Sequence, residues 1–180
     1  MKKVALILTD GFEEMEAIGT FAILSRAGLQ TDIYSFKGVS AQGRFGLMCT
    51  HLKPFDTFVP DHYDALVLPG GPQYAELEKN EKLQQYVRQF LSENKVVAAI
   101  CASPTILGRA GLLKGKNYTC FTSMDENFGG HFTAQYATTD GNLITGQSAA
   151  ATIHFAFAIV EKLLGKEKAE QVKSSIYYKN

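Results

Sequence analysis

Residues 95–104 read Lys-Val-Val-Ala-Ala-Ile-Cys-Ala-Ser-Pro, an apolar run that ends at a thiol and is followed by small residues. A continuously apolar run is typical of a strand buried on both faces of a parallel sheet. Ala102 and Ser103 permit a tight turn, and Pro104 suits the first turn of a helix. The stretch therefore predicts that Cys101 lies at the amino end of a helix. A thiol so placed can have its pKa lowered from about 8.5 to roughly 3.5–7.5.

Two further buried strands are predicted before this one in the chain. Residues 4–8 lead into the segment 10–16, which contains Glu13, Glu14 and Glu16, and residues 63–68 lead into Pro-Gly-Gly-Pro at 69–72. In doubly wound sheets, ligands bind beyond the carboxyl ends of the strands. We therefore expect the loops after these strands to meet at Cys101.

The remaining pattern alternates strands and helices, which predicts an α/β fold with a doubly wound, mostly parallel sheet sandwiched by helices. Hydrophobic spacing predicts an amphipathic helix through Leu83, Val87 and Leu91, and Asp140-Gly141 predicts a hairpin turn. The other expected elements are a helix from 13 to 28, a strand at 29–36, a hairpin or edge element at 44–52, short strands at 117–121, 132–138 and 142–144, and helices at 149–164 and 166–174.

Composition narrows the classes of protein. The chain has 180 residues, of which 46% are hydrophobic, so we expect one domain over 1–180. Lys and Arg balance Asp and Glu at 18 each, which gives no strong nucleic-acid or anionic-membrane signal. No apolar stretch is long enough to span a membrane. Three cysteines without CxxC spacing argue against disulfides and against a metal site, and a cytoplasmic location is the simplest expectation.

A thiol nucleophile needs a group that moves protons and donors for an oxyanion. Glu16 lies furthest into the predicted helix among the three glutamates, and the N–H groups of Gly71 and Ala102 could form an oxyanion hole. The alternatives stay open, because an apolar-flanked cysteine is often an inert core residue and glutamates in a first helical turn are often solvated. No histidine adjoins Cys101. Among the four histidines, His131, which follows Gly129-Gly130 in a predicted loop, is the best candidate for a site residue.

The pattern extends over nearly the whole chain, through supporting segments at 25–28, 129–131 and 158–167 and, chiefly, through three ordered motifs. They are Gly11-Phe12-Glu13-Glu14-Met15-Glu16, Leu68-Pro69-Gly70-Gly71 and Ile100-Cys101-Ala102-Ser103-Pro104. Together they resemble the ThiJ/PfpI superfamily, in particular the branch of the parkinsonism-associated protein deglycase and its bacterial relatives. The resemblance implies a flavodoxin-like, class I glutamine amidotransferase-like sandwich and a homodimer.

The resemblance also implies roles for individual residues. Cys101 would be an easily oxidised nucleophile, Glu16 its carboxyl partner, and Gly71 and Ala102 the oxyanion donors. Gly70 would support the site, and Arg26 and Arg44 match arginines near the cysteine, one of which reaches across the dimer. The alternative for both arginines is a surface salt bridge.

The sequence departs from the family pattern at three places. The peptidase-like branches have histidine after the cysteine, where this chain has Ala102, which argues against a Cys-His-Glu peptidase triad. Phe121 stands where the parkinsonism branch has another histidine, and residues 148–150 read Ser-Ala-Ala instead of Gly-Pro-Gly.

The function implied is a glutathione-independent glyoxalase or a protein or nucleotide deglycase for reactive dicarbonyls such as methylglyoxal, with no cofactor. The alternative is an oxidative-stress sensor or redox-regulated chaperone that acts through oxidation of Cys101. A cysteine hydrolase or peptidase is the third interpretation, weakened by Ala102.

Overall fold

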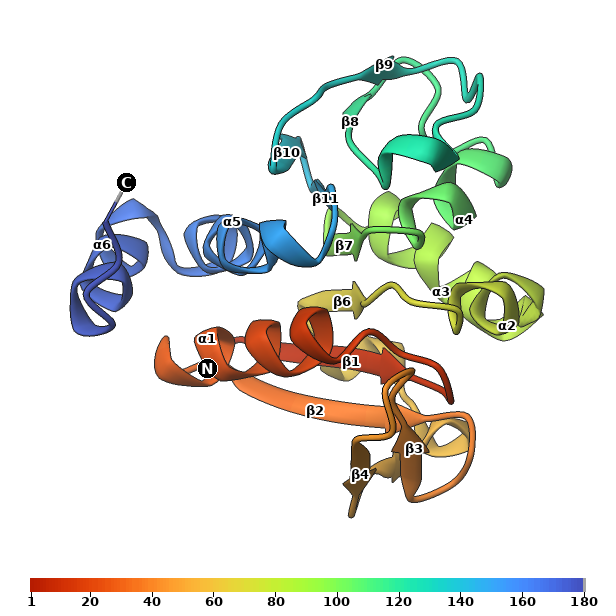
Figure 1. The fold of residues 1–180 in the computed structure, drawn as a ribbon, viewed down its shortest axis with the longest axis horizontal. Coiled ribbons are helices and arrows are strands. Elements are labelled where there is room, and N and C mark those ends of the chain that lie inside the picture. The colour runs from red at the N-terminus through yellow and green to blue at the C-terminus, as the bar shows by residue number, and fades with distance from the viewer. Residues whose placement is uncertain (180) are drawn as a thin grey trace.

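The computed structural model describes residues 1–179 and is built on a seven-stranded sheet in the order β10-β11-β7-β6-β1-β2-β5 (Figure 1). The strands are β1 (Lys3–Leu8), β2 (Gln30–Ser35), β5 (Lys53–Pro54), β6 (Ala65–Leu68), β7 (Val96–Ile100), β10 (Ala137–Asp140) and β11 (Leu143–Gly146). Neighbouring strands are parallel except in the β10–β11 hairpin. The sheet thus places the carboxyl ends of β1, β6 and β7 side by side.

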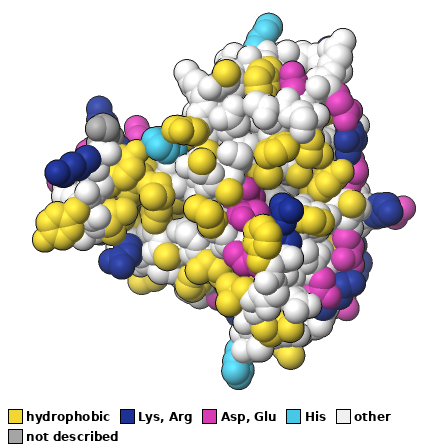
Figure 2. All heavy atoms as spheres, viewed as in Figure 1, with side chains coloured by type: hydrophobic (Ala, Val, Ile, Leu, Met, Phe, Trp, Pro, Cys, Tyr) yellow, Lys and Arg dark blue, Asp and Glu magenta, His cyan; other side chains and the backbone are white. Residues whose placement is uncertain are grey.

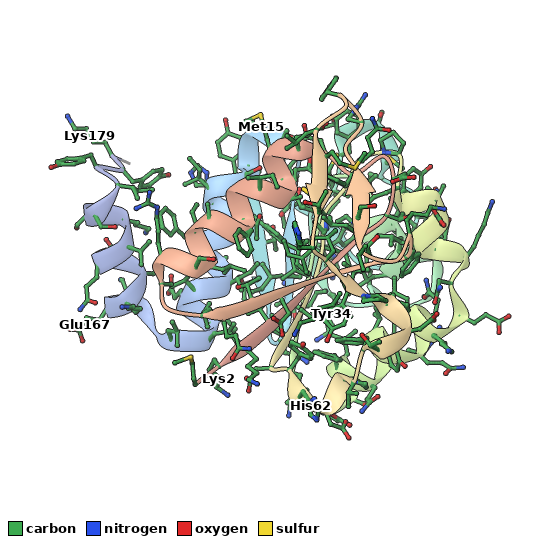
Figure 3. All side chains as sticks on the ribbon, turned by 90° about the horizontal axis from the view of Figure 1, so that it is seen from below. Lys2, Met15, Tyr34, His62, Glu167 and Lys179 are labelled. Carbon is green, nitrogen blue, oxygen red and sulfur yellow. The ribbon has the colours of Figure 1, made fainter. Side chains whose placement is uncertain are left out.

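Helices cover both faces of the sheet. They are the π-helical turn η1 (Met15–Gly19), α1 (Thr20–Arg26), α2 (Tyr74–Lys79), α3 (Glu81–Ser92), α4 (Pro104–Arg109), α5 (Thr152–Leu164) and α6 (Lys166–Ser175). Alternate residues of β1 face opposite cores: Leu6 packs with α1, α5 and α6, and Ile7 packs with α2, α3 and α4. In Figure 3, α1 and α5 run together on one side of the strands. The predicted doubly wound sandwich is confirmed.

Most of the predicted strands and helices lie where the sequence indicated. The buried strands at 4–8, 63–68 and 96–100 are β1, β6 and β7, and every residue of β7 is buried. The turn at Gly141, with φ 63°, joins β10 to β11. The two closing helices are α5 and α6, separated by Gly165 with φ 90°.

Four details differ from the sequence-based prediction. The helix expected from 13 to 28 begins as η1, and the element expected at 44–52 is a hairpin of β3 (Ser40–Gln42) and β4 (Met48–Thr50). The strands expected at 117–121 and 132–138 are only β8 (Asn117–Tyr118) and β9 (His131–Phe132), while residues 137–138 belong to β10. Helix α2 was not predicted, because it buries little beyond Leu77 and so has no apolar periodicity.

The helices of residues 1–179 include none that is both long and apolar enough to cross a membrane.

Candidate functional site

Three loops meet at the carboxyl ends of β1, β6 and β7. The N–H group of Gly70, after β6, donates to Oε2 of Glu16 at 2.8 Å. The Cys101 side chain, after β7, lies beside the same carboxyl group, because a Cβ placed on Gly70 would be 2.6 Å from Cβ of Cys101 and 2.7 Å from Oε2 of Glu16. The predicted convergence of these loops is therefore present in the structure, and it lies at the sheet edge where doubly wound folds bind ligands.

Cys101 occupies a strained turn. Its φ is 64°, a left-handed conformation that costs an ordinary residue about 1–2 kcal/mol. Its N–H group donates to the oxygen of Gly146 at 2.9 Å, and its own oxygen accepts from the N–H group of Phe121 at 2.8 Å. These bonds hold the turn in place and leave the thiol half-buried between β7 and α4.

Glu16 lies in the wide turn η1 and is fully buried. Its N–H group donates to Oε2 of Glu13 at 2.9 Å, and its own Oε1 accepts no bond from an N–H or O–H group of residues 1–179. Burial raises the pKa of Glu16 from 4.5 to about 7, against the lowering effect of the Gly70 N–H bond. A carboxyl group with this pKa can both accept and donate a proton near neutral pH.

The Cys101 pKa differs from the sequence-based expectation. Burial raises it from 9.0 to about 12, and the nearby Glu16 carboxylate adds to this rise. The N–H groups of Gly71 and Ala102 lower the pKa of the thiol, but by less. The expected lowering by the helix end was therefore wrong in net direction, because desolvation and the adjacent negative charge outweigh the N–H donors. Protonation of Glu16 would remove that charge, so the thiol and the carboxyl group titrate as a pair.

Two consecutive peptide units present their N–H groups to this pair. The Pro69–Gly70 unit directs its N–H group to Glu16, and the oxygen of the next unit, Gly70 O, accepts from the N–H group of Glu13 at 3.0 Å. That second unit carries the Gly71 N–H group, which lowers the pKa of Cys101. Because a peptide unit is planar, fixing its oxygen also fixes the direction of its N–H group.

Both glycines are required by this close approach. A Cβ on Gly70 would lie 2.6 Å from Cβ of Cys101 and 2.7 Å from Oε2 of Glu16. Gly71 has φ 87°, and a Cβ there would lie 2.5 Å from the oxygen of Gly11. No other residue type could bring the chain this close to the thiol.

The two arginines are placed differently. The backbone N–H group of Arg44 donates to the oxygen of Phe12 at 2.9 Å, and its charge lowers the pKa of Glu16. Its guanidinium lies 4.8 Å from the centre of the Phe45 ring. Arg26 ends α1, is exposed, and forms no salt bridge or side-chain hydrogen bond within residues 1–179. Arg44 thus lies at the site of its own chain, whereas no contact connects Arg26 to it.

The side chain of His131 makes no hydrogen bond to a residue of the site within residues 1–179. His131 lies in β9, paired with Asn117 of β8, and its side chain is exposed. Its ring makes no hydrogen bond with any part of the chain that the structure describes. The expectation that His131 supports the site therefore has no contact behind it.

Sequence reasoning missed two buried side chains beneath the site. Gln73 bridges two loops, because Oε1 accepts from the N–H group of Thr9 and Nε2 donates to the oxygen of Pro69, both at 2.8 Å. The Ser103 hydroxyl donates to the same oxygen at 2.7 Å. Ser103 had been noted only as a small turn residue, and no pattern in the sequence distinguishes Gln73.

Within residues 1–179, no three His, Cys, Asp or Glu side chains are grouped so that they could hold a metal ion, and the three cysteines are not disulfide-bonded.

Comparison with known proteins matches the sequence and the fold of this chain to one family. The sequence profile of the DJ-1/PfpI family matches residues 2–162. Deglycase PfpI of Pyrococcus furiosus is 32% identical over 148 residues, with 81% of this chain and 89% of that protein covered. Protein DJ-1 homolog B of Arabidopsis thaliana is 34% identical over 179 residues, which are 96% of this chain but only 40% of that longer protein. The crystal structure of Drosophila melanogaster DJ-1beta has a TM-score of 0.92 at 29% identity and covers 99% of both chains.

Proposed function

Since the chain belongs to the DJ-1/PfpI family, we propose that it is a glutathione-independent glyoxalase, or a protein or nucleotide deglycase, that acts on reactive dicarbonyls such as methylglyoxal. The observation that carries the proposal is the position of the Cys101 side chain beside the buried carboxyl group of Glu16, whose pKa of about 7 suits proton transfer. Relatives named as deglycases support the reaction class.

In the glyoxalase form of this proposal, the Cys101 sulfur attacks the aldehyde carbon while its proton passes to Glu16. A C–S bond forms, and the π electrons of the C=O bond move to oxygen, where the N–H groups of Gly71 and Ala102 stabilise the charge. Glu16 then protonates that oxygen, which gives a hemithioacetal. This order of events suits a thiol whose pKa is raised by burial, because the thiolate forms by transfer to Glu16 rather than in the resting site.

The remaining steps need only proton transfer and water. Removal of the proton from C1 and its return to C2, through an enediol, converts the hemithioacetal to a lactoyl thioester without net oxidation. Hydrolysis of the thioester releases lactate and restores the thiol. Glu16 is the group placed to move these protons, since its Oε1 has no competing N–H or O–H partner in residues 1–179.

Methylglyoxal consumption by Cys101→Ser and Glu16→Gln variants tests the proposal. We expect each to lose at least about 100-fold in kcat/KM, a typical loss for a proton-transfer group or nucleophile. Cys49→Ser is the matched control, because Cys49 is also a half-buried thiol but lies on β4. This substitution should leave the rate of methylglyoxal consumption unchanged. If Cys101→Ser consumed methylglyoxal as fast as the parent, the proposed function would be wrong.

A redox sensor or redox-regulated chaperone is the second candidate. The observation that favours it is the set of N–H donors around the half-buried Cys101 sulfur, beside a carboxyl group that can carry a proton, because sulfinate oxygens need such donors. Intact mass and peptide mapping after graded peroxide treatment test it. Oxygen addition at Cys49 before Cys101 would exclude this candidate.

We also propose a homodimer. Figure 2 shows hydrophobic side chains beside charged ones near the ends of β1 and β6. Met15, Phe45 and Met48 are 60%, 75% and 52% exposed, and Met15 projects from the side of the molecule formed by α1 (Figure 3). Exposed apolar groups of this size favour a protein partner. Sedimentation that gives a monomer at micromolar concentration would contradict the proposal.

A further inference from the structure

The oxygen of Pro69 lies next to the candidate site and accepts two side-chain hydrogen bonds. Nε2 of Gln73 donates to it at 2.8 Å, and the Ser103 hydroxyl donates at 2.7 Å. Gln73 and Ser103 are 1% and 0% exposed, so water does not compete for these bonds. Gln73 is itself fixed by the N–H group of Thr9, at 2.8 Å from its Oε1. Three segments are therefore tied to one carbonyl group.

The N–H group of the same peptide unit donates to Glu16. The C=O group of Pro69 and the N–H group of Gly70 belong to one planar trans unit, so they point in opposite directions. Donors that hold the oxygen therefore aim the Gly70 N–H group, which donates to Oε2 of Glu16 at 2.8 Å. Donation to the oxygen also polarises the unit, which strengthens its N–H group as a donor.

We propose that Gln73 and Ser103 are positioning residues, which act through the Pro69–Gly70 peptide unit to set how tightly Glu16 holds its proton. Neither side chain needs to touch substrate for this role. The inference rests on the proposed function only where turnover is concerned, because proton binding by Glu16 can be measured without substrate.

Neither substitution alters the charged and titratable groups that face Glu16. They are Glu13 on the same segment, Cys101 after β7 and Arg44 in the β3–β4 turn. The bond from Gly70 lowers the pKa of Glu16, second in size only to the effect of burial. A weaker or misdirected N–H group must therefore raise that pKa further.

The experiment follows Glu16 by carboxyl ¹³C NMR in protein labelled at glutamate Cδ, with Glu16→Gln used for assignment. We expect Gln73→Met and Ser103→Ala to raise the titration midpoint of Glu16 by about half to one pKa unit, part of what one charge-assisted hydrogen bond contributes. The pH midpoint of kcat/KM for methylglyoxal should rise by the same amount.

Asn142→Ala is the matched control. Nδ2 of Asn142 also donates to two carbonyl groups, those of Leu91 and Lys95, at 3.1 and 2.8 Å, but at the amino ends of β7 and β11. The Asn142→Ala variant should be less stable than the parent, but Glu16 in it should titrate with the same midpoint as in the parent. An unchanged midpoint in Ser103→Ala or Gln73→Met, or an equal rise in Asn142→Ala, would overturn the inference.

Ser103→Ala decides the matter if Gln73→Met does not fold, because it leaves the Gln73 bonds in place. If the parent does not consume methylglyoxal, the proposed function fails while the NMR titration still tests the positioning role.

Discussion

Replacing Glu16 with Gln should remove a large pH dependence of stability. The unfolded chain gives up the Glu16 proton near pH 4.5, whereas the folded chain keeps it to about pH 7. Between these values the unfolded state binds fewer protons, so the free energy of unfolding of the parent falls as pH rises. An interval of 2.5 pKa units, from 4.5 to about 7, at about 1.4 kcal/mol per unit, amounts to about 3.5 kcal/mol for the complete titration.

Glutamine keeps the shape of the side chain and an oxygen for the Gly70 N–H group, but it carries no charge at any pH. The free energy of unfolding of Glu16→Gln, minus that of the parent, should therefore rise by about 3 kcal/mol between pH 4.5 and pH 8. The other carboxyl groups are present in both proteins, so their contributions cancel in this difference. The stability gained by the variant should be complete once pH exceeds about 7.

Urea unfolding at pH 5, 6, 7 and 8, at one protein concentration, measures the difference. Glu161→Gln is the control, since Glu161 is exposed on α5 and its replacement should give a flat difference. A flat difference for Glu16→Gln as well would contradict the prediction, because it would mean that burial in η1 does not hold a proton on Glu16 in the folded state.

Two further substitutions test the geometry around the thiol. Gly70→Ala places a Cβ 2.6 Å from Cβ of Cys101 and 2.7 Å from Oε2 of Glu16, so it should separate the pair and lower kcat/KM for methylglyoxal about 100-fold; parent-like turnover would contradict this. Cys101→Gly should be about 1 kcal/mol more stable to urea than Cys101→Ala, because glycine adopts the φ of 64° without strain. Equal stability of the two variants would show that the turn stores no strain.

Much of the fold could be predicted because its central strands have a simple signal. Residues 96–100 are apolar without interruption, and a strand buried on both faces allows little else. The same logic placed β1 and β6, and the order of the three loops then indicated that Cys101 and Glu16 lie together. What identified Glu16 among three glutamates was its depth in the helix, which the structure shows as complete burial.

The parts that could not be predicted depend on contacts between distant segments. The π-helical turn that carries Glu16 has no pattern of its own in the sequence, and the bonds of Gln73 join loops 64 residues apart. The pKa of Cys101 was predicted in the wrong direction, because local reasoning counted the N–H donors but not the desolvation or the carboxylate. His131 was a candidate because it follows Gly129-Gly130 in a predicted loop, and the fold places it in an exposed β-ladder.

The two successive peptide units at 69–71 also affect how the site tolerates mutation. Its donors are main-chain N–H groups, so no exchange of a donor side chain can delete them, whereas added bulk at Gly70 or Gly71 would displace them. The Phe121 N–H group binds the Cys101 oxygen through the main chain as well, and the Phe121 side chain is 40% exposed, so codon changes there can alter the surface near Cys101 without deleting that bond. The chain thereby separates positions whose side chains can be exchanged from the two glycines, at which any side chain would displace the site.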